Sequence, residues 1–426
     1  MSSAIHKTLL TTVLMTMIGF VSSVATARIL GPQERGLLSA ALMIGTLSAS
    51  IAQLGLANAY VYFYGAGRSF NYLRLLVMSL LAVACVAILF GLGGIYLSDK
   101  PRLSESWIWI LLFSAGTGAQ LYFLSLSQLK SGLSFYNKIR FGQVCGNALL
   151  LIPIFYIYQL HASFEPVLWA QVSVAFALAG AGMMWARRHH VWDAINGHSP
   201  ATIGGFLRYG LHQHGSNILS LILLNFDKII LINRGSMEEY GYYAMAFTTS
   251  RLIGALQDSL SVALFARFAG KDIEELSIKV KSAFRMTFVP MLMLAGLGAA
   301  LSPWLVVWVY GNKFAPMVLP FAILLFECVI SGANGTLAQR FTAAGLPGLL
   351  LIRQFMSLIP VLIAMPFLPA ENIYISLALL MLLASSMRLV VTLIMFPLSL
   401  KESMPKLLPT KQDINTILKL RFRSPN

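Results

Sequence analysis

Six ionisable side chains lie within stretches of sequence that are otherwise strongly apolar. They comprise three acids and three bases: Asp227, Asp258, Glu327, Lys228, Arg251 and Arg388. An arginine stays charged in an apolar setting, and its planar guanidinium binds two phosphate oxygens at once. A carboxyl group in a half-wet cavity can take up a proton. These residue types indicate a site that binds an anion and couples to a cation, or alternatively charge pairs that fix the register of helices.

Helical spacing gathers these charges on polar stripes. Arg251 and Asp258 share one face with Gly254, but they are seven residues and hence two turns apart, which is too far for an ion pair. The charge of Arg251 is therefore expected to be uncompensated and available to a ligand. Two further stripes have the same polar character: Glu327 with Ser331 and Asn334, and Arg388 with Ser385 and Thr392.

The adjacent residues Asp227 and Lys228 interrupt the apolar stretch "ILLNFDKIILI". Successive helix residues point about 100° apart, so these two are expected to be poor partners for each other and to pair across a helix bundle instead. They share the polar side of their helix with Asn217. The candidate cation-coupling residues are therefore Glu327, Asp258 and Asp227.

The composition indicates which solvent surrounds these charges. Hydrophobic residues make up 57% of the 426 residues and charged residues only 11%, whereas soluble domains carry about 25% charged residues. A run of about 20 apolar residues spans a bilayer. Twelve such stretches are present: residues 8–27, 38–63, 75–97, 107–129, 141–158, 167–186, 211–233, 242–266, 286–310, 317–339, 350–368 and 373–396. The sequence predicts an all-α polytopic membrane protein with twelve transmembrane helices.

The distribution of basic residues predicts the orientation of these helices. Of the 31 Lys and Arg residues, 22 fall on the side of the N-terminus, 6 on the opposite side and 3 within spans. Cytoplasmic loops are enriched in Lys and Arg, so both termini are predicted to be cytoplasmic. The net charge of +15 then follows from topology, and indicates a lipid bilayer rather than nucleic acid as partner. The three cysteines all fall within predicted spans, which argues against a disulfide framework or a metal site.

The chain also repeats itself. "PQERGLLSAALMIG" (32–45) matches "MEEYGYYAMAFTTS" (237–250) at an offset of 205, which places Glu34 on Glu239 and Gly36 on Gly241. "GLSFYNKIR" (132–140) matches "GLPGLLLIR" (345–353) at an offset of 213. We therefore expect two six-helix bundles related by a parallel pseudo-repeat. The expected domains are residues 1–200, residues 201–400 and a basic cytoplasmic tail, residues 401–426.

Three segments carry a resemblance to a known family. "ARILGPQERGLLSA" (27–40) resembles the motif between the first two spans of polysaccharide transporters. "LNFDKIILINRGSMEEYGYYAMA" (224–246) resembles the corresponding region of their second half, although Ser236 stands where the offset of 205 places the counterpart of Gly31. "YGNKFAPM" (310–317) is similar to the loop before their tenth span. The family is the lipid-linked oligosaccharide flippases of the multidrug/oligosaccharidyl-lipid/polysaccharide exporter superfamily.

This resemblance implies a flippase of the bacterial inner membrane that serves polysaccharide biosynthesis, as for O-antigen lipopolysaccharide. Its substrate would be an undecaprenyl-pyrophosphate-linked oligosaccharide, moved by alternating access. It would need no cofactor beyond a proton or sodium gradient, and its partners would include a polysaccharide polymerase and glycosyltransferases. The implied substrate-binding residues are three arginines for the pyrophosphate and two amides: Arg251, Arg28, Arg388, Asn217 and Gln53.

Two alternatives remain at the level of sequence. A multidrug exporter of the same superfamily would share the fold and differ in substrate. A membrane-embedded glycan polymerase or ligase would place its catalytic groups in a sizeable outer loop. The longest outer loops, residues 98–106 and 159–166, hold no acid/base constellation, so the sequence favours a transporter over an enzyme.

Overall fold

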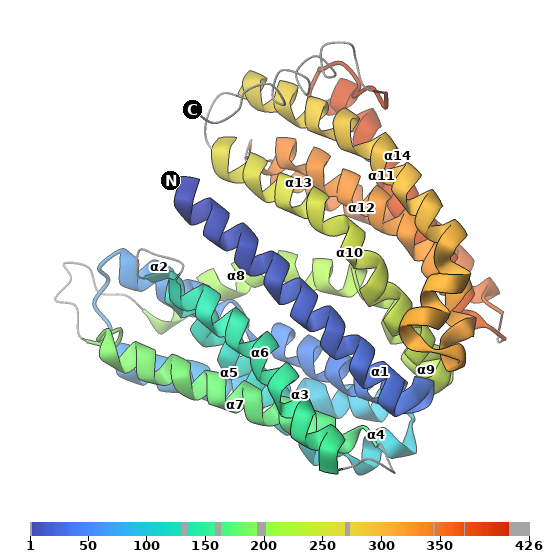
Figure 1. Cartoon of the computed structure of the whole chain (residues 1–426). Coiled ribbons are helices and arrows are strands. Elements are labelled where there is room, and N and C mark those ends of the chain that lie inside the picture. The colour runs from blue at the N-terminus through green and yellow to red at the C-terminus, as the bar shows by residue number, and fades with distance from the viewer. Residues whose placement is uncertain are drawn as a thin grey trace. The chain divides into compact units, whose positions relative to one another are not determined.

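The computed structural model describes residues 2–129, 134–157, 163–193, 202–268, 273–343, 346–369 and 371–408. These residues form α-helices joined by short turns and contain no extended sheet (Figure 1). The α-helices are α1 (Ser2–Ala52), α2 (Leu56–Gly65), α3 (Tyr72–Ser98), α4 (Pro101–Glu105), α5 (Trp107–Leu126), α6 (Ser134–Ile157), α7 (Glu165–Arg188), α8 (Ile203–Leu223), α9 (Phe226–Arg234), α10 (Met237–Phe268), α11 (Ile273–Tyr310), α12 (Val318–Ala343), α13 (Pro347–Ala364) and α14 (Ile373–Ser399). Short 3-10 helices occupy Ser127–Leu129, Asn312–Met317 and Met365–Phe367.

Each of the twelve predicted spans coincides with helix in the described part of the chain. By length and composition, eight helical stretches there could cross a membrane, and the first of them, residues 14–65, covers two predicted spans. Within it, Gly31 has a positive φ of 71° and Pro32 follows, so α1 consists of two helices, residues 2–30 and 32–52. The all-α polytopic architecture is as predicted.

Two predicted spans are not continuous helices. The second span breaks between α1 and α2, where Leu54 (φ 46°) and Gly55 (φ 67°) adopt left-handed conformations. The seventh span breaks between α8, which ends at Leu223, and α9, which begins at Phe226. Hydrophobic periodicity does not detect such breaks, because apolar residues continue through both of them.

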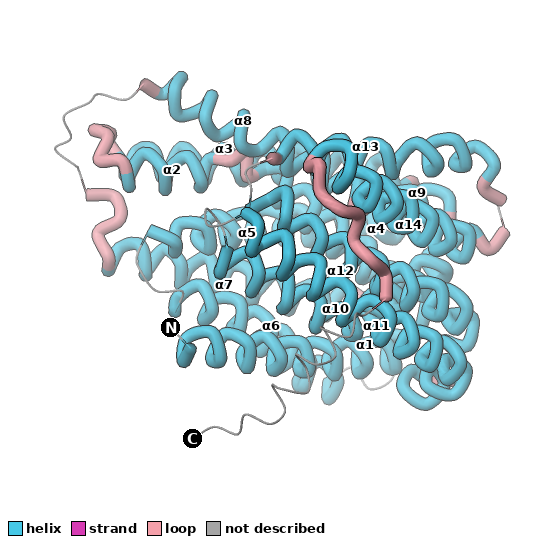
Figure 2. The backbone as a smooth tube through the Cα atoms, turned by 90° about the horizontal axis from the view of Figure 1, so that it is seen from above, coloured by secondary structure: helices cyan, strands magenta, loops and turns pink. Residues whose placement is uncertain are grey.

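The chain forms two compact units, residues 1–241 and 242–426. In the first unit α1 packs against α3, α5 and α6, and α5 packs against α7. α2 packs against α8 (Figure 2). In the second unit α12 packs against α11 and α14, and α14 packs against α13 (Figure 1). The first unit thus includes α8 and α9. The boundary at residue 200, which rests on the sequence repeat, stays a prediction.

The two segments matched by the sequence repeat meet each other within the first unit. A Cβ atom on Gly36 would overlap the carbonyl oxygen of Met237, and a Cβ atom on Gly241 would overlap the carbonyl oxygen of Pro32. The offset of 205 matches Pro32 with Met237 and Gly36 with Gly241, so the contact is reciprocal. This reciprocity is what a local two-fold axis between the segments requires. Only glycine at both positions allows the backbones to approach this closely.

The repeated segments begin with different turns. Gly31 uses its left-handed φ to start the helical segment at Pro32. Its sequence counterpart Ser236 caps α10 instead. Its hydroxyl accepts a hydrogen bond from the Glu239 backbone N–H (3.1 Å), while the Glu239 carboxylate accepts one from the Ser236 backbone N–H (2.9 Å). This capping box satisfies two backbone donors, so the departure from glycine at residue 236 is compensated locally.

Candidate functional site: a buried arginine network in the second unit

The second unit holds a close ion pair between α10 and α12. The Nη2 atom of Arg251 lies 2.5 Å from Oε2 of Glu327, and the Glu327 side chain is only 2% exposed. The other carboxylate oxygen of Glu327 accepts a hydrogen bond from the Ser385 hydroxyl on α14 (2.7 Å). The Arg251 guanidinium also stands over the Phe247 ring, 4.2 Å from its centroid. Both oxygens of Glu327 and one face of Arg251 are therefore occupied.

This geometry overturns one expectation. Arg251 was expected to carry an uncompensated charge because Asp258 lies two turns away, but Glu327, 76 residues along the chain, supplies the counter-charge. Asp258 is exposed on α10. A partner on another helix cannot be inferred from the spacing along α10 alone.

The network continues from Glu327 along the polar stripes of α12 and α14. The Asn334 amide donates a hydrogen bond to the Ser385 carbonyl oxygen (2.9 Å), and the Thr392 hydroxyl donates one to Asn334 Oδ1 (3.3 Å). Nη1 of Arg353 donates to the Asn334 carbonyl oxygen (3.1 Å) and to the Thr392 hydroxyl (3.3 Å). The stripes predicted on α12 and α14 thus face each other, and α13 joins them.

Arg353 is the residue that sequence analysis missed. It was counted among the cytoplasmic basic residues, but it lies two turns inside α13 and is 6% exposed. The signal available in the sequence was its position seven residues into an apolar stretch that begins at Pro347. The count of 22 cytoplasmic basic residues included it because positive charge is, on average, a marker of loops.

Arg388 lies on α14 between Ser385 and Thr392 and is half-buried. It interacts electrostatically with Glu327 and Arg251. Among the described residues, neither Arg388 nor Arg353 forms an ion pair with a carboxylate, and the buried Nε atom of each has no hydrogen-bond partner there. Among the described residues, the centre of the second unit therefore combines three arginines with one carboxylate, which gives this cluster a net positive charge.

Such a cluster can bind an anion. Buried charges are costly unless they are paired, so two arginines without carboxylate partners favour an anionic ligand that would complete their hydrogen bonds. The planar guanidinium suits phosphate oxygens. The Glu327 carboxylate is paired with Arg251. This ion pair can separate only if the carboxylate loses its charge or if an anionic ligand takes its place at Arg251.

The remaining predicted site residues lie in the first unit. Gln53 stands at the break between α1 and α2, and Arg28 is exposed on α1, three residues before the Gly31 kink. Asn217 belongs to α8, but its side chain lies outside the described residues. The structure therefore brings Arg251, Glu327 and Arg388 into one network within the second unit, whereas Gln53 and Arg28 belong to the first unit.

Asp227 is fully buried in the first turn of α9. A carboxylate is stabilised there by the backbone N–H groups at the helix N-terminus. Nζ of Lys228 is 3.9 Å from Oδ1 of Asp227 and donates a hydrogen bond to Asn225 Oδ1 (3.2 Å). The break before α9 thus gives Asp227 a structural reason to be inside the bundle, and its role in cation coupling stays a prediction.

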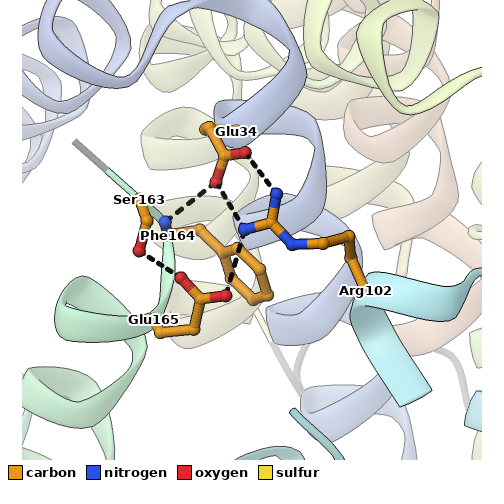
Figure 3. Close-up of polar contacts among 5 residues, drawn as sticks. All are labelled: Glu34, Arg102, Ser163, Phe164 and Glu165. Carbon is orange, nitrogen blue, oxygen red and sulfur yellow. Dashed lines mark hydrogen bonds and ion pairs between the residues drawn. The ribbon is translucent and has the colours of Figure 1, made fainter. Parts of the chain in front are cut away.

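A second charged network fastens three helix ends of the first unit (Figure 3). Arg102 on α4 donates hydrogen bonds to Glu34 on α1 (2.9 Å) and to Glu165 on α7 (3.1 Å). Glu34 also accepts from the Phe164 backbone N–H (3.1 Å), and the Ser163 hydroxyl donates to Glu165. The hydrogen bond to Glu165, with that to Glu34, raises the pKa of Arg102 against the opposing effect of burial. All charges here are paired within the protein, which indicates a structural role.

Comparisons with known proteins place this architecture. A family model described as "Polysaccharide biosynthesis protein" matches residues 5–270. The chain belongs to the polysaccharide biosynthesis protein family. A search of curated proteins by sequence finds no match.

Solved structures similar to this polysaccharide biosynthesis protein are transporters. A lipid II flippase, MurJ, in an inward closed conformation has a TM-score of 0.67 at 14% identity, over 98% of this chain and 93% of its own. An inward-facing multidrug resistance transporter of the MATE family and MOP superfamily also has a TM-score of 0.67 at 14% identity, over 91% and 96%. A MOP superfamily transporter from Pyrococcus furiosus has a TM-score of 0.60 at 13% identity, over 92% and 94%.

These matches confirm the fold and the family resemblance predicted from the sequence. The chain has the all-α fold of MOP superfamily transporters, with two helical bundles related by a pseudo-repeat. At 13–14% identity the likeness is one of fold, so the substrate follows from the site and not from the neighbours.

Proposed function

We propose that this protein is a flippase that moves an undecaprenyl-pyrophosphate-linked oligosaccharide across the bacterial inner membrane by alternating access. The observation that carries the proposal is the cluster of three arginines around one carboxylate inside the second unit. Membership of the polysaccharide biosynthesis protein family supports a glycan substrate. A pyrophosphate is the part of such a substrate that matches buried guanidinium groups.

The pyrophosphate would bind at Arg388 and Arg251. Arg388 is half-buried and has no carboxylate partner among the described residues, so an anion gains a charge-assisted contact there without displacing another. Arg353 supports this position from α13 through Thr392. Arg28, exposed in the first unit, remains a predicted further contact.

Coupling to a cation gradient would operate at Glu327. Glu327 and the pyrophosphate compete for Arg251, because the guanidinium already donates to the carboxylate at 2.5 Å. Uptake of a proton or sodium ion by Glu327 would release Arg251 toward the phosphate oxygens, and the two binding events would then favour each other. Asp258, which is exposed on α10, the helix that also carries Arg251, is the second predicted coupling residue.

We also propose that both termini are cytoplasmic and that the translocated glycan enters polysaccharide biosynthesis, where glycosyltransferases supply it and a polymerase consumes it. A multidrug exporter is the second candidate, because a MATE family transporter shares the fold with the same TM-score of 0.67 as the lipid II flippase. Deletion of the gene distinguishes the two: a flippase mutant loses surface polysaccharide, and an exporter mutant changes its sensitivity to antibiotics.

The direct test is the affinity of the purified protein for the undecaprenyl-pyrophosphate-linked oligosaccharide in detergent. Arg388→Ala should weaken binding by about 10- to 100-fold, the effect of a lost hydrogen bond to a charged group. Arg234→Ala is the matched control, because Arg234 is an exposed arginine at the end of α9. Unchanged affinity in Arg388→Ala would place the anion elsewhere.

A further inference from the structure

The break in the second span interrupts the regular backbone hydrogen bonding of a helix. α1 ends at Ala52 and α2 begins at Leu56, with Leu54 and Gly55 in left-handed conformations between them. His214 on α8 forms a hydrogen bond with a backbone carbonyl beside this break. Its Nε2–H donates a hydrogen bond to the Ile51 carbonyl oxygen at 3.0 Å. His214 is 6% exposed and is thus a positioning residue that holds α8 against the break.

A cavity of about 270 Å³ lies at this break, within the first unit. At about 30 Å³ per molecule it has room for roughly nine waters, and it is close to the size of the smaller ligand sites, about 300 Å³. Leucine and isoleucine side chains of α5 and α8 form part of its wall. The polar part of the wall consists of Ser50, Gln53, Asn58, Ser125 and His214.

Gln53, one of the residues that line the cavity, has one strong acceptor without a donor. Its amide nitrogen donates to the Gly118 carbonyl oxygen (2.9 Å) and to the Ala49 carbonyl oxygen (3.3 Å), so the amide is held in one orientation. Its Oε1 atom is buried and has no hydrogen-bond donor among the described residues. An orphaned buried carbonyl oxygen costs free energy until a donor reaches it. The missing donor would come from whatever occupies the cavity.

The chemistry of the wall restricts the occupant. The described residues that line the cavity include no carboxylate, lysine or arginine, so they suit neither a pyrophosphate nor a strongly bound divalent cation. The Nε2 proton of His214 is already used by Ile51. The remaining hydroxyl and amide groups of Ser50, Ser125 and Asn58 both donate and accept hydrogen bonds. Together with apolar patches they match a neutral ligand that carries hydroxyl groups on a C–H framework.

We propose that this cavity binds a sugar residue of the translocated substrate, with Gln53 Oε1 accepting a hydrogen bond from a sugar hydroxyl. The inference rests on the proposed flippase function and adds to it a carbohydrate subsite that is built from residues of the first unit, whereas the arginine cluster is built from residues of the second. The cavity accommodates one sugar ring rather than a whole oligosaccharide. Gln53 and Ser125 then determine how much affinity the glycan adds to that of the lipid pyrophosphate.

The test is site-specific protection of a thiol. Leu124→Cys, whose native side chain lines the cavity, is introduced into a variant in which Cys85, Cys145 and Cys328 are replaced by alanine. Gln33→Cys, at an exposed position on α1, is the control. Labelling by a water-soluble methanethiosulfonate is measured with two probes: the undecaprenyl-pyrophosphate-linked oligosaccharide extracted from cells that lack this protein, and undecaprenyl pyrophosphate alone.

We expect the glycan-bearing lipid to protect the cysteine at residue 124, and the sugar-free lipid to leave it reactive although it binds. Equal protection by both lipids would overturn the carbohydrate assignment, because the lipid or the pyrophosphate would then fill the cavity. Binding of both lipids without protection would also overturn it and leave the proposed function standing. Binding of neither lipid would overturn the proposed function itself.

A second measurement compares affinities for the same two lipids. Gln53→Leu and Ser125→Ala should each reduce the ratio of the two affinities by about 3- to 10-fold, the effect of one hydrogen bond. Both should leave the affinity for undecaprenyl pyrophosphate unchanged. Ser173→Ala, on the exposed face of α7, is the matched control. An unchanged ratio in Ser125→Ala and Gln53→Leu contradicts the proposal even if one variant is less stable.

Discussion

Glu327 divides its two oxygens between Arg251 and Ser385, so each oxygen of this buried carboxylate accepts a hydrogen bond. A buried ion pair contributes little net stability, but removing one partner leaves the other charge uncompensated. Arg251→Ala alone should therefore destabilise the protein by up to about 3–5 kcal/mol, with the lower part of this range applying because the Arg251 side chain is 31% exposed.

A double substitution that removes both charges of the pair distinguishes its contribution to stability from its role in transport. Arg251→Ala combined with Glu327→Gln should recover most of the thermal stability in detergent, because both members of this ion pair are removed and neither is left without the other, but it should not recover transport. Glu327→Gln alone should fold and insert while losing cation-coupled export of glycan. Normal export by this variant under proton and sodium gradients would show that the carboxylate is structural.

Glu402 forms pH-dependent ion pairs and a hydrogen bond at the end of the second unit. It follows α14 and contacts α11 and α12, with Lys281 at 2.9 Å, Arg340 at 2.7 Å and the Ser277 hydroxyl as partners. Burial alone would raise its pKa, but the hydrogen bonds from Lys281, Ser277 and Arg340 outweigh burial and hold the pKa below the ordinary value of 4.5. The folded protein thus binds this proton less readily than the unfolded chain.

The direction of the pH effect on stability follows from the lowered pKa of Glu402. A depressed pKa contributes stability that is fully present above the unfolded value of 4.5 and is lost as the pH falls through the folded value. The melting temperature of the wild type should therefore fall more steeply than that of Glu402→Gln between pH 5 and pH 3, a window around about 4.5. Parallel curves of melting temperature against pH for the two proteins would mean that the ion pairs of Glu402 contribute nothing to stability.

At the scale of elements, the helix crossing at Gly36 and Gly241 depends on glycine at both of these matched positions. Gly36→Ala or Gly241→Ala would force a methyl group into a backbone carbonyl, and backbone atoms cannot move aside as a flexible side chain does. Each substitution should destabilise the protein by about 1–3 kcal/mol, the usual cost of overpacking. The measurement is thermal unfolding in detergent.

Gly180 on α7 is the control for this prediction, because a Cβ atom there meets no atom within 4 Å. Gly180→Ala should be neutral or stabilise by up to about 1 kcal/mol, since alanine favours the helix more than glycine does. The double substitution of Gly36 and Gly241 should cost less than the sum of the two single costs, because both relieve the same contact by separating the segments. Full additivity would argue against a shared crossing.

At the scale of the whole molecule, the excess of basic residues on one side defines a testable topology. In a cysteine-free background, Asn312→Cys should react with an impermeant thiol reagent added outside cells, because residue 312 lies in an exposed turn between α11 and α12. Ser403→Cys, exposed after α14, should react only after the membrane is opened. The reverse pattern would invert the orientation of the protein.

The candidate site was predictable in part. Glu327, Arg251 and Arg388 were identified because ionisable residues inside apolar stretches stand out, and the stripes of α12 and α14 were identified by helical spacing. Their pairing was not predictable, since Arg251 and Glu327 are 76 residues apart. Arg353 was missed because it is only the fourth residue of the predicted span 350–368 and was counted with the adjoining cytoplasmic loop. The breaks at Gly55 and Asn225 were missed because hydropathy is unchanged across them.

The sequence by itself determined that the chain is a membrane protein, where its spans lie and that its halves repeat. Hydropathy and segment length are properties of each segment alone, and they require no knowledge of its neighbours. Only the tertiary structure decided that Glu327 neutralises Arg251, that Arg353 is buried and that His214 bonds to Ile51 across 163 residues. A charge or a hydrogen bond is completed by whichever group the fold brings within about 3 Å, and that partner comes from another helix.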